Sequence, residues 1–410
     1  MTGRRVLAAA VLTMATAGLC TGSVAAQPLS VGQSCPALWV LGVQGTSESS
    51  PTASETADIG MLGQLLGPVV AAAPDLVART YIAYPAAFGG AVGTGGGTDP
   101  YAVSVDAGLS ALADTASQIA ADCPSTALAA VGYSQGAQVV SSFAQAVGAG
   151  QGPIDPGRVA AIALFSDPAR APGSPVIPGR PGQLTPDPAP ETSGAAVSAV
   201  VITTGVASGG GLAATSGVDY GALTGRVIDV CVEGDLGCSA PDRAALLRVA
   251  AQLTAQADLR DPIAALKSIG SLLSATLGSA WTTVVNNDFQ LGPGSVDYAP
   301  AASLAQRLTE AADSRTPVPG PEQSATASAR WAQITSVVAS DPITQLPKLA
   351  AQLSAAWAAL IGDNADLLDP AVWLRYTDIF ARHTGYAATG QLASGVAWLL
   401  ALTHDLAGSH

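Results

Sequence analysis

Short apolar runs alternate with longer amphipathic stretches along the first 238 residues. Six of these runs are rich in aliphatic and β-branched residues, which predicts strands. The stretches 59–73, 101–121 and 137–147 repeat apolar positions at helical spacing. Alternating strands and helices predict an α/β fold, with a mostly parallel sheet covered by helices on both faces. The predicted strands are Ala37–Val43, Arg79–Tyr84, Ala127–Val131, Val159–Phe165, Ala199–Thr203 and Val227–Val232.

Two loops interrupt this pattern. Residues 171–195 are rich in proline, which cannot donate ladder hydrogen bonds, and we predict an exposed excursion there. The triplet Gly209-Gly210-Gly211 predicts a second, flexible stretch.

The pattern changes after Cys238. Residues 240–380 are rich in Ala and Leu and predict a mainly helical segment, with loops at 286–300 and 315–321. Two of its helices carry apolar stripes, which need a surface to bury against. A last helix at 390–406 has an apolar core too short to span a membrane. The predicted helices are 244–257, 262–277, 301–312, 325–338 and 343–361, with stripes at Leu246, Val249 and Leu253 and at Leu266, Ile269, Leu272 and Leu273.

The N-terminus predicts export. Arg4 and Arg5 precede an apolar run, and Val24-Ala25-Ala26 offers a small-residue cleavage site before Gln27. This is the pattern of a secretory signal peptide over residues 1–26. A membrane anchor is the alternative, although the run is short for a span. Lipidation at Cys20 is a second alternative, although a small residue normally precedes a lipid-bearing cysteine.

Cysteine placement supports an oxidising compartment. Cleavage at Ala26 would leave four of the five cysteines, which allow three pairings. Cys35 and Cys123 each precede a proline and a predicted strand, so both lie at the entry edge of a parallel sheet. Cys231 and Cys238 are close enough in sequence to close one loop. We therefore favour Cys35–Cys123 and Cys231–Cys238.

The charge balance limits the partners. The chain carries 17 basic and 30 acidic side chains, for a net charge of −13, and only 11% of its residues are charged. This acidic balance argues against nucleic acid and against an anionic membrane surface as partners.

The chemistry centres on Gly132-Tyr133-Ser134-Gln135-Gly136. A predicted strand precedes this G-x-S-x-G motif and a predicted helix follows it, which is the setting of a nucleophile elbow. The motif predicts Ser134 as the nucleophile. It also places the Gln135 N–H and the helix N-terminus where they can stabilise a developing oxyanion.

A base and an acid should follow the serine, in the order acid and then histidine. Among His383, His404 and His410, we favour His383 as the base because a glycine turn lies beside it. His404 ends a predicted helix and His410 ends the chain. For the acid we favour Asp235, because a disulfide-closed loop would fix its carboxylate. Glu233 and Asp242 are the alternatives.

These motifs together resemble the cutinase family of secreted serine esterases, in its actinobacterial branch. Cys35-Pro36, Tyr84-Pro85-Ala86 and the segment from Cys123 to Ala137 resemble family segments. Gln44-Gly45-Thr46-Ser47-Glu48 resembles its oxyanion motif, the segment from Cys231 to Cys238 its acid loop, and His383-Thr384-Gly385-Tyr386 its base motif. The resemblance implies a cutinase-like α/β-hydrolase fold and a triad of Ser134, Asp235 and His383. It also implies an oxyanion hole formed by Thr46 and Gln135.

The chain departs from the family in two places. Gln44 replaces the usual arginine, so a supporting ion pair is expected to be missing. Asp235 and His383 are 148 positions apart, where compact relatives have a short loop. We predict a cutinase-like core at 27–239, a helical cap at 240–380 beside the Ser134 face, and a catalytic-histidine loop with a final helix at 381–410.

The expected function is hydrolysis of carboxylic esters, including lipid-like esters, through an acyl-enzyme. The alternatives are acyl transfer to a sugar or lipid acceptor of the cell envelope, and a catalytically silent envelope-binding protein. No metal and no organic cofactor is expected. We expect a secreted or envelope-associated monomer. We also expect it to make transient contact with lipid or cell-envelope surfaces.

Overall fold

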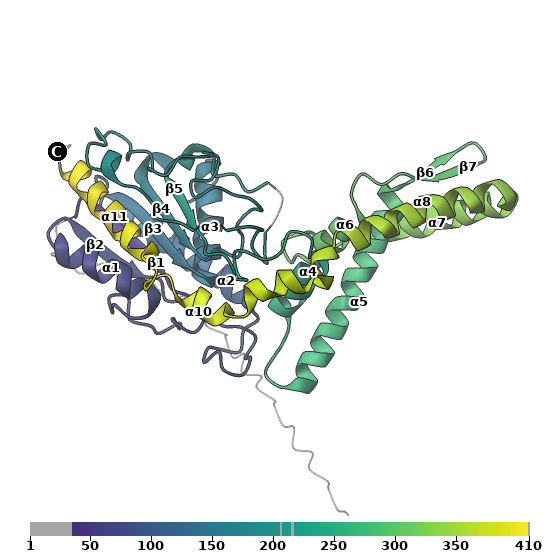
Figure 1. Ribbon diagram of the computed structural model, residues 1–410, viewed down its shortest axis with the longest axis horizontal. Helices are drawn as coiled ribbons and strands as arrows, with labels where there is room; N and C mark the ends of the chain where they lie inside the picture. Colours follow the sequence, from purple (N-terminus) through teal and green to yellow (C-terminus); the bar gives the residue numbers. More distant parts are fainter. Residues whose placement is uncertain (1–34, 206, 215–216, 409–410) are drawn as a thin grey trace, which may run out of the picture. The chain divides into compact units, whose positions relative to one another are not determined.

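The computed structural model describes residues 35–205, 207–214 and 217–408. The predicted signal peptide, Cys20 and His410 lie outside the described residues. The helices and strands lie within one compact unit (Figure 1).

The core is a five-stranded parallel sheet in the order β2-β1-β3-β4-β5. The three inner strands are continuous apolar runs with almost every residue buried, as expected where helices cover both faces of a sheet. The predicted α/β fold is therefore correct. The strands are β1 (Leu38–Val43), β2 (Val77–Tyr81), β3 (Ala127–Tyr133), β4 (Val159–Phe165) and β5 (Val227–Val230).

Two pairs of helices cover the sheet. Helices α1 (Gly60–Ala72) and α11 (Gln391–Ala407) pack together on one face, and α2 (Tyr101–Asp122) and α3 (Gln135–Gly148) pack together on the other (Figure 1). Leucines of α1 and the fully buried Trp398 of α11 belong to the same core cluster as the strands. The C-terminal helix therefore completes the core, although a long insertion separates it from β5.

Both favoured disulfides are present. Cys35–Cys123 joins the residues before β1 to the end of α2, and Cys231–Cys238 closes the loop after β5.

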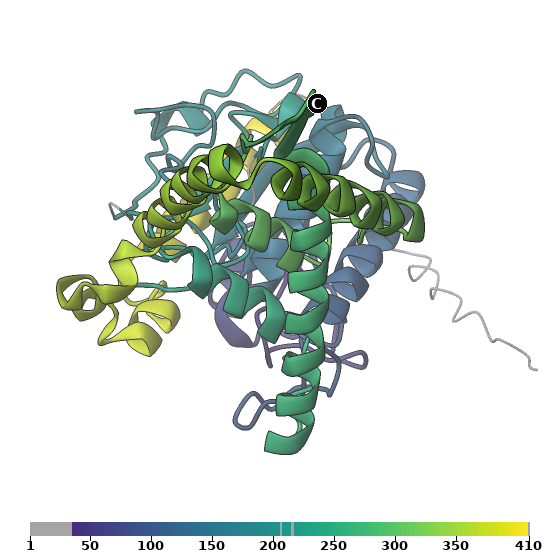
Figure 2. The same cartoon turned by 90° about the vertical axis from the view of Figure 1, so that its right-hand side faces the viewer.

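The insertion is mainly helical and has buried clusters of its own. Val249 and Leu253 of α4 pack with Ala312 of α6, and a separate cluster joins α5, α7, α8 and a hairpin. Figure 2 shows these helices from the side of the insertion. The elements are α4 (Ala245–Gln256), α5 (Pro262–Asn287), β6 (Phe289–Gly292), β7 (Ser295–Tyr298), α6 (Leu304–Ala312), α7 (Pro321–Ser340), α8 (Pro342–Gly362), α9 (Pro370–Trp373) and α10 (Ile379–Thr384).

Two loop and strand predictions are wrong, and a third, the exposed proline-rich excursion at 171–195, is correct in part. Residues 199–203 form no strand: Val200 and Ile202 are buried and Val201 is exposed, but this extended segment packs on the core outside the sheet. The predicted loop at 286–300 contains the antiparallel hairpin β6–β7, whose turn includes Gly294 at φ 70°. The proline-rich loop is not simply exposed, because Ile177 is fully buried and Val176 O accepts the Asp229 N–H. It thus covers edge strand β5, which would otherwise present unpaired backbone groups.

The glycine triplet serves close packing and not flexibility. A Cβ on Gly209 would lie 1.9 Å from Ala240 O, and one on Gly211 would lie 1.9 Å from Pro168 O. Gly210 itself pairs with Ala240 in an antiparallel bridge. Only glycine allows these backbone segments to approach so closely.

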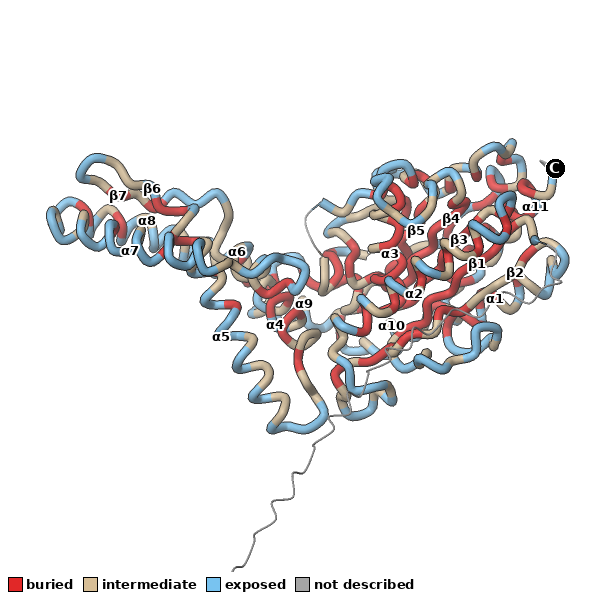
Figure 3. Tube along the Cα trace, turned by 180° about the vertical axis from the view of Figure 1, so that it is seen from behind, coloured by how far each residue is buried: buried red, intermediate tan, exposed pale blue. Residues whose placement is uncertain are grey.

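The apolar stripe of α5 is not buried as predicted. Leu266 is 76% exposed, and Leu273 and Leu277 are also exposed, so most of this helix is drawn as exposed or intermediate in Figure 3. Helix α5 is long and apolar enough to cross a membrane, judged by length and composition only. Among the described helices it is the only one that meets both criteria. The stripe of α4, in contrast, is buried at Val249 and Leu253.

Candidate active site

Ser134 lies in the tight turn between β3 and α3. Its φ of 53° and ψ of −121° form a strained conformation that a residue with a side chain rarely adopts. The flanking glycines are required by close backbone contacts. A Cβ on Gly132 would lie 2.4 Å from Gly136 O, and one on Gly136 would lie 2.0 Å from Val43 O. The turn therefore brings α3 tightly against the strands, with Ser134 at the carboxyl edge of the sheet.

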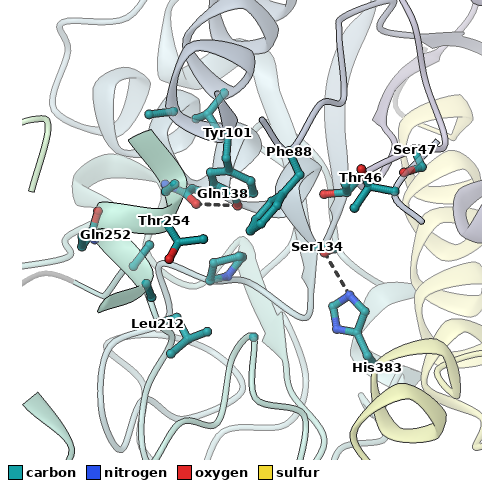
Figure 4. Close-up of a pocket in the computed structure, with 18 of the residues that line it drawn as sticks. Thr46, Ser47, Phe88, Tyr101, Ser134, Gln138, Leu212, Gln252, Thr254 and His383 are labelled. Carbon is teal, nitrogen blue, oxygen red and sulfur yellow. Dashed lines mark hydrogen bonds between the residues drawn. The ribbon is translucent and has the colours of Figure 1, made fainter. Parts of the chain in front are cut away.

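His383 connects Ser134 to Asp235. Its Nε2 lies 3.0 Å from Ser134 Oγ, and its Nδ1 lies 2.9 Å from Asp235 Oδ1 (Figure 4 shows the first of these bonds). Because an ionised carboxylate only accepts hydrogen bonds, Nδ1 carries the proton and donates it to Asp235. Nε2 is then an acceptor for the Ser134 hydroxyl. This chain of hydrogen bonds has the order that base-assisted nucleophilic attack requires.

Asp235 is fully buried in the loop closed by the Cys231–Cys238 disulfide. Its Oδ2 accepts a hydrogen bond of 2.8 Å from the Tyr386 hydroxyl. Burial alone would raise the pKa of Asp235, but the hydrogen bond and charge of His383, with hydrogen bonds from Ser166 and Tyr386, lower it below its usual value. The carboxylate therefore stays ionised beside the histidine.

His383 sits at the end of short helix α10, before Gly385, and its side chain is 31% exposed. Burial acts to lower the pKa of His383. The hydrogen bond and charge of Asp235, together with the charge of Glu48, outweigh burial and raise that pKa above its ordinary value. A histidine with a raised pKa accepts the serine proton more readily, provided that it is neutral at the working pH.

Three neighbours of the histidine were given no role of their own in the sequence analysis. Ser166 Oγ lies 3.0 Å from His383 Nδ1, and the Tyr133 hydroxyl donates to the His383 carbonyl at 2.7 Å. Tyr386 packs edge-on against Tyr133 and holds Asp235 as described. Ser166 follows β4 directly, so its position at the carboxyl edge of the sheet was a usable signal. Its φ of 57° was not readable from the sequence.

The loop with Thr46 is held by two side chains at the N-terminus of α1. Gln44 Oε1 accepts the Leu62 N–H at 3.3 Å, and its Nε2 donates to Ile59 O at 2.6 Å. Glu48 accepts N–H groups of Gly45 and Met61. A carboxylate at a helix N-terminus is stabilised by the helix dipole. The side chains of Gln44 and Glu48 thus support this loop through hydrogen bonds with backbone groups. These bonds stand in the place of the ion pair that the family's usual arginine was expected to form.

Thr46 and Ser134 both line a large cavity, and in Figure 4 Ser134 lies between Thr46 and His383. Gln135 begins α3, and its side chain is fully buried, with Nε2 donating to Ala87 O at 3.0 Å. The backbone of Gln135 is thereby fixed next to Ser134. Thr46 therefore lies on the side of Ser134 away from His383, and Gln135 adjoins Ser134 in the chain.

The alternative residues lie elsewhere. Glu233 pairs with Arg375 at 3.0 Å and with Ser208, and Asp242 is exposed beyond the disulfide loop. His404 is exposed in the last turn of α11. Within the described residues, no group of three or more His, Cys, Asp or Glu side chains could hold a metal ion.

Residues 34–249, more than half of the chain, match the family described as Cutinase. The cutinase CUT1 of Coprinopsis cinerea is 30% identical over 167 residues, which cover 38% of this chain and 72% of that protein. A carboxylesterase Culp6 homolog of Corynebacterium glutamicum is 33% identical over 122 residues, covering 29% of this chain but only 37% of that protein. The catalytic core of an acetyl xylan esterase from Trichoderma reesei aligns with a TM-score of 0.36 and 24% identity, over 58% of this chain and 99% of that one.

The family match and the two relatives identify the protein as a carboxylic ester hydrolase. The chain belongs to the cutinase family.

Glu48→Gln is expected to move the acidic limb of the pH profile of kcat/KM to lower pH. A general base acts only when neutral, so activity falls as the pH drops through the pKa of His383. The Glu48 charge contributes to raising that pKa, and the neutral amide removes this contribution. Rates on a soluble ester across neutral and mildly acidic pH measure the shift. Glu310→Gln, on α6 and outside the cavity, is the matched control. An acidic limb that stays in place or moves to higher pH contradicts the assignment of His383 as the base whose pKa the Glu48 charge raises.

Proposed function

We propose that the protein is a serine esterase that cleaves carboxylic esters through a covalent acyl-enzyme on Ser134. The observation that carries this is the hydrogen-bonded chain from Ser134 through His383 to the buried Asp235. Family membership supports the reaction class.

In the first step His383 Nε2 takes the proton of Ser134 as Oγ attacks the ester carbonyl. Asp235 keeps the Nδ1–H tautomer and stabilises the imidazolium that forms. The carbonyl oxygen becomes an oxyanion, which the backbone N–H groups of Thr46 and Gln135 stabilise together with the N-terminus of α3. Each such donor contributes roughly 3 kcal/mol to lowering the barrier.

The second step reverses these roles. Imidazolium protonates the leaving alkoxide, the alcohol departs, and a water molecule enters. His383 then removes a proton from this water as its oxygen attacks the acyl carbon. The bond between Ser134 Oγ and the acyl carbon breaks, and the imidazolium returns its proton to Oγ, which releases the carboxylic acid and restores Ser134. The same groups act twice, so no further proton carrier is needed.

We place this activity outside the cytoplasm. The two disulfides support an oxidising compartment, and removal of residues 1–26 would leave all four bonded cysteines in the mature chain.

Labelling with a fluorophosphonate tests the proposal. A nucleophilic serine activated by a histidine is expected to react with it, whereas a silent envelope-binding protein is not. We expect labelled protein in the medium of an expressing culture, with the probe on Ser134 and an N-terminus near Gln27. An unlabelled, folded protein would rule out the esterase. A labelled protein retained in the cells with its leader intact would rule out export.

A further inference from the structure

The cavity at Ser134 is much larger than the reacting atoms require. Its volume is about 880 Å³, near the upper end of the range for small-molecule sites. It extends from Ser134 and His383 to helix α4 of the insertion. Figure 4 shows Gln252 and Thr254 of α4 on one side of the cavity and Ser134 with His383 on the other, with Phe88 and Gln138 drawn between them.

Helix α4 presents two apolar surfaces. Val249 and Leu253 bury one of them against Ala312 of α6. The other consists of apolar side chains that line the cavity, namely Leu247, Ala250, Ala251 and Ala255. Gln252 and Thr254 of α4 line the cavity as well, and the Thr254 hydroxyl donates to Ala250 O of its own helix at 2.7 Å. The small side chains among the apolar ones leave room for a ligand.

A second wall comes from the core. Phe88 together with Ala102 and Val105 of α2 line it. Phe88 packs edge-on against Tyr101, with ring centroids 5.4 Å apart, and the Tyr101 hydroxyl donates to Gln138 at 2.8 Å. Asp106 of α2 adds an exposed carboxylate, but the lining of the cavity is mainly apolar.

Both ends of α4 are tied down. At its start the Leu246 N–H donates to Asn364 Oδ1 at 2.7 Å, and after its end the Leu259 N–H donates to Gly89 O in the core at 2.7 Å. Gln256 Nε2 donates to Ala312 O at 2.7 Å. The wall is therefore preorganised, and a bound ligand need not order it.

We propose that α4 forms the binding wall for the aliphatic acyl chain of the ester, and that Leu247, Ala250 and Ala251 set the chain length that the enzyme accepts. The inference rests on the proposed esterase function. With the carbonyl at Ser134, a long acyl chain would follow the channel to α4, whereas an acetyl group would leave the channel unfilled. This assigns a specificity role to a helix that lies largely outside the core.

A series of p-nitrophenyl esters from acetate to dodecanoate tests the proposal. While the channel fills, kcat/KM should rise by up to about fourfold for each added methylene, the factor that corresponds to burying one CH₂. Ala250→Trp should lower the ratio of kcat/KM for dodecanoate over acetate at least about tenfold, since it blocks several methylene positions. Leu247→Ala, which widens the channel, provides a second variant should the tryptophan not be tolerated, and should favour branched over linear long chains.

Leu246→Trp is the matched control. Leu246 neighbours Leu247 on the same helix, but it is 44% exposed and does not line the cavity. It should leave the chain-length profile unchanged. If acetate is hydrolysed but the profile is flat, or if Ala250→Trp and Leu246→Trp give the same profile, α4 is not the acyl wall and the esterase proposal stands. If no ester is hydrolysed and fluorophosphonate does not label Ser134, both proposals fall.

Discussion

Ser134→Ala is expected to lower kcat for ester hydrolysis by roughly 10⁴- to 10⁶-fold. The substitution removes the oxygen that forms the acyl-enzyme and leaves the binding groups in place. The residual rate would come from the oxyanion donors and from substrate positioning alone. The fold should persist, because alanine has the same Cβ as serine at this positive φ, and the Oγ bonds to His383 at the surface of the cavity.

A soluble p-nitrophenyl ester, assayed with purified protein, measures this loss. Ser314→Ala is the matched control, because Ser314 also lines the cavity but belongs to the loop after α6 of the insertion. It should retain most of the activity. Thermal unfolding of both variants should match the parent. A Ser134→Ala protein that keeps more than about a tenth of the rate would show that another nucleophile acts, since loss of a triad serine costs far more.

The hydrogen-bonded set of Ser134, His383 and Asp235 could be predicted because local sequence features mark each of the three residues. The elbow needs glycine at 132 and 136, where any Cβ would strike backbone atoms. Asp235 lies between two cysteines that bond to each other, so the sequence marks the ends of its loop. His383 was one of three candidate histidines, and Gly385 follows the short helix that carries His383.

The residues that contact or act on His383 from other segments were not predicted, because their effect depends on contacts between parts of the chain that are distant in sequence. Ser166 reaches His383 across 217 positions of sequence, and Glu48 raises the histidine pKa from a loop in the first part of the chain. A buried serine after a strand and a carboxylate near a helix start are common features. Only the fold makes these two act on the same imidazole.

The apolar patterns of the insertion predicted its helices correctly, but they did not predict which helix faces are buried. The stripe of α4 at Val249 and Leu253 is buried, while the stripe of α5 at Leu266 and Leu273 is exposed. Periodicity states which residues share a face of a helix, not what that face contacts. For the same reason the sequence predicted a cap but could not indicate that α4 supplies the cavity wall.

His383→Ala is expected to cost about as much as Ser134→Ala, because a serine without its base is a weak nucleophile and the triad acts as a unit. The double variant should therefore be no slower than either single variant. His404→Ala provides the matched control. His404 is an exposed histidine at the C-terminal end of α11, and its loss should leave kcat unchanged.

Steady-state rates of the three single variants and of the double variant on one soluble ester test whether His383 is the base for Ser134. Additive losses in the double variant would mean that Ser134 and His383 act independently, against the 3.0 Å contact between Nε2 and Oγ. A large loss in His404→Ala with a small loss in His383→Ala would move the base to α11. In that case the Asp235 carboxylate, which contacts His383 at 2.9 Å, would serve the structure of the Cys231–Cys238 loop and not the reaction.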